Sequence, residues 1–121
     1  MQKQILIVEN TADYRQLLQE IVAGMGLTPI VADCATKGVQ LLAANQISLV
    51  LLDIKMPSFH GDHFLRFIRR QGNNVPVAVV SAYLTPDVLQ TVQRFGVRHV
   101  VIKPFKVQRL AQVVTQALAE D

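Results

Sequence analysis

Short hydrophobic runs alternate with amphipathic segments along the chain, and this pattern repeats five times. The hydrophobic runs are nearly continuous, which is typical of parallel strands that are buried on both faces. They predict strands over residues 4–8, 28–32, 47–52, 76–80 and 97–102. The segments between and after them carry hydrophobic residues at helical spacing, so each predicted strand is followed by a predicted helix.

Glycine, proline and threonine support these helix boundaries. Thr85 can cap the fourth helix, and Pro86 suits its first turn because proline lacks the N–H that a helix leaves unpaired there. Glycines are expected to end the first, third and fourth helices, at Gly24 and Gly26, at Gly72, and at Gly96.

Five strand–helix units predict an α/β fold with a parallel sheet covered by helices on both faces. The 121 residues match one domain, expected over residues 1–121, and the 50% hydrophobic content excludes a disordered chain. The single cysteine excludes a disulfide scaffold. The longest hydrophobic runs are too short to cross a bilayer and no signal peptide is visible, so we expect a cytoplasmic protein without membrane contact.

Charge adds little to this picture. The net charge is +3, and the basic residues are scattered rather than gathered in a run or interleaved with aromatic residues. Direct binding of nucleic acid is therefore not expected.

Polar residues stand directly after four of the five predicted strands, and they form a chemical set: Glu9 with Asn10, Asp53, Ser81 and Lys103. In open parallel sheets, ligands bind beyond the carboxyl ends of the strands, so these side chains are expected to face one site. Asp53 at a strand end can act as a nucleophile toward phosphorus and form an aspartyl phosphate. The Lys103 ammonium and the Ser81 hydroxyl can then match charge on the phosphoryl oxygens. Glu9, Asn10 and Asp53 offer the oxygen ligands that Mg²⁺ prefers.

The chain resembles the receiver domains of bacterial two-component response regulators over essentially its whole length. The resemblance is carried by residues 5–10, by residues 51–57 with Gly61 following, by the pair Ser81 and Ala82, and by residues 103–105. It implies a flavodoxin-like (βα)5 sandwich whose parallel strands lie in the order 2-1-3-4-5.

The resemblance also implies a role for each motif residue. Asp53 matches the residue that accepts a phosphoryl group from the phosphohistidine of a histidine kinase. Mg²⁺ is expected on Glu9, Asn10, Asp53 and the backbone carbonyl of Lys55. Ser81 matches the hydroxyl residue that moves to the phosphoryl group, Ala82 the small residue that leaves access to it, and Lys103 the lysine that pairs with a phosphoryl oxygen. The Lys103–Pro104 peptide bond is expected to be cis.

Two positions depart from the family pattern. Asn10 stands where the family usually has aspartate, which removes one formal charge from the metal site. Val100 stands where the family commonly has an aromatic ring that rotates on activation. These departures support an alternative, a pseudo-receiver that binds partners without being phosphorylated. A flavodoxin-like small-molecule binder is a third interpretation, disfavoured because no glycine-rich phosphate loop follows the first strand.

The leading interpretation is therefore a phosphorylation switch rather than an independent enzyme, with at most slow autodephosphorylation. Its phosphodonor would be a sensor histidine kinase or a phosphotransfer protein. A downstream protein would bind the surface from Thr85 to Ala119, which carries the cationic or titratable residues Arg94, His99, Lys106 and Arg109.

Overall fold

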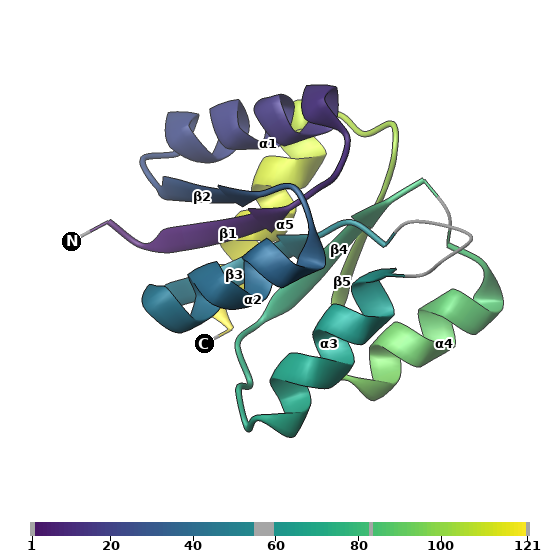
Figure 1. The fold of residues 1–121 in the computed structure, drawn as a ribbon. Coiled ribbons are helices and arrows are strands. Elements are labelled where there is room, and N and C mark those ends of the chain that lie inside the picture. The colour runs from purple at the N-terminus through teal and green to yellow at the C-terminus, as the bar shows by residue number, and fades with distance from the viewer. Residues whose placement is uncertain (1, 55–59, 83, 121) are drawn as a thin grey trace.

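The computed structural model describes residues 2–54, 60–82 and 84–120, and within them five parallel strands form one sheet (Figure 1). The strands lie in the order β2-β1-β3-β4-β5, as predicted. Their bounds are β1 Gln4–Val8, β2 Thr28–Ala32, β3 Ile47–Leu52, β4 Val77–Ser81 and β5 His99–Ile102. The central strand β3 pairs with β1 on one side and β4 on the other, so the order reverses between β1 and β3.

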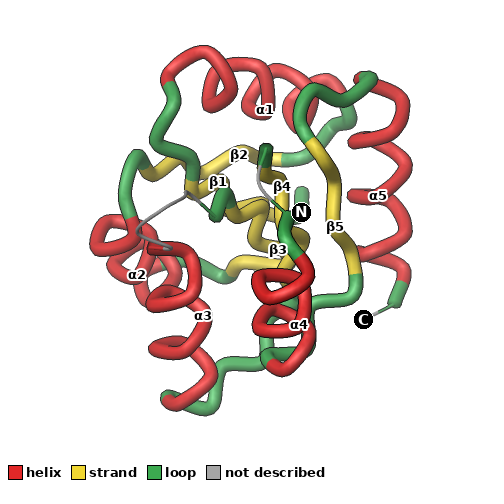
Figure 2. The backbone as a smooth tube through the Cα atoms, turned by 90° about the vertical axis from the view of Figure 1, so that its right-hand side faces the viewer, coloured by secondary structure: helices red, strands yellow, loops and turns green. Residues whose placement is uncertain are grey.

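Helices cover both faces of this sheet (Figure 2). On one face lie α1 (Ala12–Gly24) and α5 (Val107–Ala119), and on the other lie α2 (Ala35–Ala44), α3 (His60–Arg70) and α4 (Pro86–Arg94). No helix in the described part of the chain has the length and apolar character of a membrane span.

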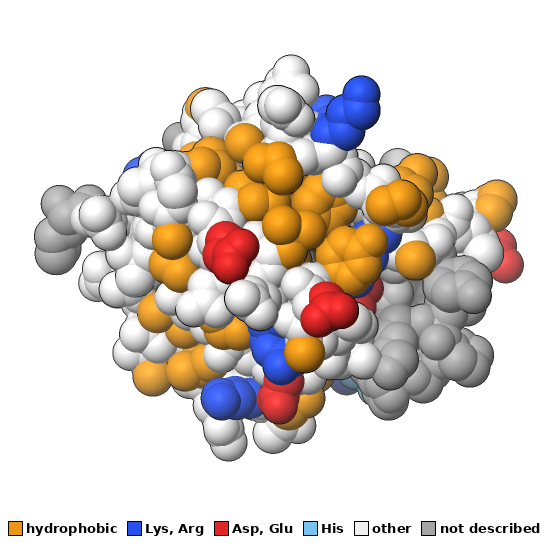
Figure 3. Space-filling model, turned by 90° about the horizontal axis from the view of Figure 1, so that it is seen from above, with side chains coloured by type: hydrophobic (Ala, Val, Ile, Leu, Met, Phe, Trp, Pro, Cys, Tyr) orange, Lys and Arg blue, Asp and Glu red, His pale blue; other side chains and the backbone are white. Residues whose placement is uncertain are grey.

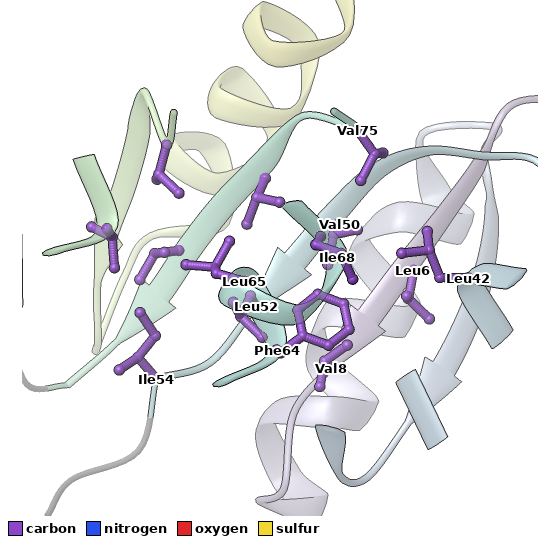
Figure 4. Packing of buried hydrophobic residues seen from close by; sticks show 14 of the residues in the cluster. Leu6, Val8, Leu42, Val50, Leu52, Ile54, Phe64, Leu65, Ile68 and Val75 are labelled. Atoms are coloured by element: carbon purple, nitrogen blue, oxygen red, sulfur yellow. The ribbon is translucent and has the colours of Figure 1, made fainter. Parts of the chain in front are cut away.

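The core consists of two layers because side chains alternate across each strand. Leu6 and Val8 of β1 point toward α2, α3 and α4, where Phe64 packs among them (Figure 4). Ile5 and Ile7 point to the opposite layer, under α1 and α5. Strand residues are therefore buried on both faces, which explains the continuous hydrophobic runs in the sequence.

Strands β4 and β5 differ from the sequence prediction at three boundaries, one of which is the end of β4, at Ser81 rather than at residue 80. β5 begins at His99 rather than at residue 97, because Gly96 adopts a φ of +81° and the Val97 N–H bonds back to the Val92 carbonyl at the end of α4. Val97 is nevertheless buried, at 4% exposure, so a turn residue contributes a hydrophobic side chain to the core. β4 pairs from Val77 rather than Pro76, since proline has no N–H to give to the ladder.

The predicted start of α4 is confirmed. The Thr85 hydroxyl accepts a hydrogen bond from the Val88 N–H at 3.2 Å, and Pro86 and Asp87 stand in the first turn. Asp87 there complements the positive end of the helix dipole.

Hydrophobic side chains gather in a patch on the side of the molecule that carries α1 (Figure 3). A shallow groove between α1 and α5 is lined by Leu17, Ile21, Met25, Val107 and Ala111, with Glu20 at its side. Val107 is half exposed there, at 50%.

Candidate functional site

Strand pairing continues one residue past the ends of β1, β3 and β5, and this fixes the residues that follow them. Three backbone hydrogen bonds of 2.9–3.0 Å do this: Glu9 N–H to the Ala32 carbonyl, Asp53 N–H to the Val8 carbonyl, and Lys103 N–H to the Ser81 carbonyl. Glu9, Asp53 and Lys103 therefore stand at the edge of the sheet, each fixed by a backbone hydrogen bond to a neighbouring strand.

Glu9 is a buried carboxylate with a full set of partners. Its residue is 1% exposed, and its Oε1 lies 2.7 Å from the ammonium of Lys103. Its Oε2 accepts the Thr11 N–H at 3.1 Å, and its backbone carbonyl accepts a hydrogen bond from Arg15 at 3.0 Å. A charge in this position would be costly without such partners, so the Lys103 contact is central to the site.

Asp53 shares the same ammonium, since its Oδ2 lies 3.5 Å from Lys103 Nζ. The Asp53 side chain is 9% exposed. Burial, together with hydrogen bonding and charge repulsion from Glu9, raises the pKa of Asp53 from 3.8 to about 7, although Lys103 acts in the opposite direction. Two carboxylates thus face one cation in a partly desolvated place.

Lys103 is held on a second side by an aromatic ring. Its ammonium lies 4.2 Å from the centroid of the Tyr14 ring, and its side chain is 7% exposed. Tyr14 belongs to the first turn of α1 and in turn contacts the ring of Phe105 at 5.9 Å. The Lys103–Pro104 peptide bond is cis, as the resemblance to receiver domains implied.

Ser81 is the last residue of β4, the strand next to β3, and it is also buried, at 1% exposure. Its hydroxyl donates a hydrogen bond of 2.7 Å to the carbonyl of Ile54, directly after Asp53. Ala82 follows it and is exposed. The Ser81 hydroxyl therefore lies next to the backbone at the end of β3.

The oxygen donors fit a hard divalent cation. Glu9 and Asp53 both contact one ammonium, so a single cation can lie within reach of both carboxylates. Asn10 stands next to Glu9 and is exposed, and its amide oxygen is a further donor. No group of three His, Cys, Asp or Glu residues suited to a metal is found among the described residues, and a site with two carboxylates suits Mg²⁺, which keeps several waters. Lys55, expected to add a backbone carbonyl, lies outside the described residues.

Among the described residues, some that were not predicted to belong to the site also contact it, and three of these come from one helix and its N-cap. Thr11, Tyr14 and Arg15 all lie at or near the start of α1. The sequence holds no signal that the Tyr14 ring contacts a lysine 89 positions away, since that contact depends on how α1 packs on the sheet.

Comparison with known proteins agrees with this geometry. The family model described as the response regulator receiver domain matches residues 5–115. The Regulator of RpoS of Escherichia coli K12 is 35% identical over 117 residues, which cover 96% of this chain and 35% of that protein. The response regulator protein FleR of Pseudomonas aeruginosa is 28% identical over 116 residues, 96% of this chain and 24% of that protein. The chain thus spans about a third or less of the length of these relatives.

Solved structures show the same fold at lower sequence identity. A CheY-like receiver domain protein from Methanospirillum hungatei superposes with a TM-score of 0.91 at 22% identity, covering 99% of this chain and 96% of that one. The chemotaxis protein CheY4 of Vibrio cholerae gives a TM-score of 0.90 at 18% identity, covering 98% and 100%. The family match over nearly the whole chain, on a sheet of this strand order, shows that the chain belongs to the response regulator receiver domains of two-component signalling.

Proposed function

We propose that this receiver domain is a phosphorylation switch in which Asp53 accepts a phosphoryl group from the phosphohistidine of a sensor kinase or a phosphotransfer protein. The observation that carries the proposal is the shared ammonium: Lys103 Nζ lies 2.7 Å from Glu9 and 3.5 Å from Asp53 at one edge of the sheet. A nucleophilic carboxylate, a cation and a second carboxylate for metal binding are thereby held together.

The metal ligands in this proposal are Glu9, Asn10, Asp53 and the backbone carbonyl of Lys55. When bound, Mg²⁺ would supply positive charge toward the oxygens of the transferring phosphoryl group. Support comes from the two carboxylates that already contact one cation. Because Lys103 contacts both, binding of a divalent cation requires that the ammonium give up at least part of these contacts.

The transfer itself needs few protein groups. A carboxylate oxygen of Asp53 attacks phosphorus, the bond between phosphorus and the kinase imidazole nitrogen breaks, and the electron pair of that bond stays on the imidazole. Lys103 then pairs with a phosphoryl oxygen, because its ammonium already lies beside Asp53. Ala82 is small and exposed, which leaves access to the site.

Ser81 would transmit the effect of Asp53 phosphorylation from the site to the outer surface of the domain. Its hydroxyl is bonded to the Ile54 carbonyl in the structure described here, and in the proposal it exchanges this partner for a phosphoryl oxygen. The added negative charge and this exchange would shift the conformation of the surface from Thr85 to Ala119, where a downstream protein would bind. Exposed hydrophobic side chains on that surface support the proposal: Ile102 is 61% exposed and Val107 is 50% exposed.

The proposed phosphoprotein has no catalytic turnover beyond slow hydrolysis of its own aspartyl phosphate, and it keeps the cytoplasmic location expected from the sequence. The alternative, a pseudo-receiver that is not phosphorylated, depends on Asn10 and Val100. The presence of Asp53, Lys103 and Ser81 at one edge of the sheet supports phosphorylation over this alternative.

Intact-mass spectrometry tests the proposal. The wild-type chain and the Asp53→Asn variant are incubated with acetyl phosphate, each with Mg²⁺ or with a chelator. We expect the wild-type chain to gain one phosphoryl group only with Mg²⁺, and the variant to gain none. A folded wild-type chain that gains no phosphoryl group from acetyl phosphate or from purified kinases would favour the pseudo-receiver.

A further inference from the structure

The ammonium of Lys103 contacts an aromatic ring, that of Tyr14, which is not among the motif residues. The ammonium lies 4.2 Å from the centroid of the Tyr14 ring, within the range of a cation–π contact. Glu9 and Asp53 contact the same ammonium. The cation is therefore held by two carboxylates and by the negative face of one ring.

This contact is stronger than one on an open surface. The Lys103 side chain is 7% exposed, and cation–π attraction increases when water is excluded from the cation. Lysine has four rotatable bonds and no fixed geometry of its own, so its ammonium takes the position that its surroundings impose. The ring limits where the ammonium can move when its contacts with the carboxylates change.

The ring is itself fixed in place. Tyr14 packs against Phe105 with the two rings 5.9 Å apart and inclined by 47°. Arg15, the next residue of α1, donates a hydrogen bond of 3.0 Å to the backbone carbonyl of Glu9. The first turns of α1 are thus tied to the end of β1, and Tyr14 contacts the segment that follows β5.

We propose that Tyr14 is a positioning residue for Lys103, an inference that rests on the proposed phosphoacceptor function. The ring keeps the ammonium beside Asp53, so that the charge is in place when the phosphoryl group arrives. Without a ring at position 14, the ammonium samples other positions and phosphorylation slows, while the fold and the carboxylates remain.

Three variants separate this role from ordinary packing. Tyr14→Phe keeps the ring, whereas Tyr14→Leu and Tyr14→Met keep a hydrophobic side chain without a ring. Phe67→Leu serves as a matched control, because it removes a half-exposed ring from α3 on the other face of the sheet. Thermal melting confirms that each variant is folded before it is compared.

The first readout is the rate of phosphorylation by acetyl phosphate with Mg²⁺. In this reaction an Asp53 oxygen bonds to phosphorus, the bond from phosphorus to the acetate oxygen breaks, and acetate leaves. We expect Tyr14→Leu and Tyr14→Met to react about fivefold more slowly, which corresponds to about 1 kcal/mol. Tyr14→Phe and the Phe67→Leu control should stay within about twofold of the wild-type rate, a difference of at most about 0.4 kcal/mol.

The second readout does not depend on phosphorylation. The ε-methylene protons of Lys103, assigned by comparison with Lys103→Met, should be shifted upfield by the ring current of Tyr14. This shift should vanish in Tyr14→Leu and persist in Tyr14→Phe. Wild-type rates and an unchanged Lys103 shift in Tyr14→Leu would overturn the inference, as would a Tyr14→Phe variant as slow as Tyr14→Leu. A folded wild-type chain that gains no phosphoryl group from acetyl phosphate or from purified kinases contradicts the proposed function itself.

Discussion

Replacing Lys103 with methionine removes an ammonium that contacts both carboxylates and keeps a side chain of similar length. In the wild-type chain the Glu9 side chain is 0% exposed, the Lys103 side chain 7% and the Asp53 side chain 9%. The variant therefore leaves a buried carboxylate without its nearest counter-charge. We expect it to be less stable than the wild-type chain when no metal is present.

The structure sets the size of this effect. Removing one partner of a buried ion pair costs about 3–5 kcal/mol. Two features reduce the cost here: Glu9 keeps the Thr11 N–H, and Asp53 can bind a proton near neutral pH because burial raises its pKa to about 7. We therefore expect the lower end, about 3 kcal/mol. With about 4 °C for each kcal/mol in a domain of this size, the melting temperature should fall by about 12 °C.

Mg²⁺ should restore much of this loss, because a divalent cation can take the place of the ammonium between the carboxylates. A concentration one hundred times the Kd stabilises a folded state by about 2.7 kcal/mol. Mg²⁺ should bind Lys103→Met more tightly than the wild-type chain, where the ammonium competes for both carboxylates.

Urea unfolding followed by circular dichroism measures both effects, with a chelator and with Mg²⁺. Lys106→Met is the matched control, since Lys106 is an exposed lysine at the start of α5, and its loss should change stability by no more than about 0.5 kcal/mol. If Lys103→Met is as stable as the control in chelator, the shared ammonium does not balance the charge of the site and the reasoning fails.

Three further predictions follow from the site and the core. Asn10→Asp should raise Mg²⁺ affinity by about tenfold, because it adds a formal charge beside the cation, and unchanged calorimetric titrations would exclude residue 10 from the metal site. Because the pKa of Asp53 is raised from 3.8 to about 7 in the folded state, protonation of Asp53 favours folding at low pH, and this contribution to stability is lost as the pH rises through 7. Mg²⁺ affinity should increase over the same range, because the carboxylate loses its proton. Asp53→Asn should abolish both pH trends. Gly38→Ala would place a Cβ 2.9 Å from Val8 and 3.1 Å from Phe64, side chains that lie together in Figure 4, so thermal melting should show a loss of about 1 kcal/mol; an equally stable variant would mean that this contact can relax.

Much of the fold could be predicted because parallel strands buried on both faces leave a simple signal. The hydrophobic runs marked β1, β2 and β3 at the bounds that the structure has. The start of β5 was placed too early because Val97 is hydrophobic yet belongs to the turn after α4. A buried residue in a turn cannot be told from a strand residue by hydrophobicity alone.

The site was only partly predictable. Strand order brings the residues at the carboxyl ends of β1, β3, β4 and β5 to one edge of the sheet, so their proximity could be anticipated. The pairing of Lys103 with Glu9 joins residues 94 positions apart, and nothing in the local pattern indicates it. The contact of Tyr14 with Lys103 depends likewise on the packing of α1, which a helical period does not specify.

The most direct test of the account is to locate the phosphoryl group. The chain is phosphorylated with acetyl phosphate and Mg²⁺, reduced with borohydride, which converts an aspartyl phosphate to homoserine, and digested for peptide mass spectrometry. The account predicts conversion of Asp53 alone, and none when Mg²⁺ is removed. Conversion at another carboxylate, or an Asp53 that stays unmodified while the chain gains a phosphoryl group, would contradict it.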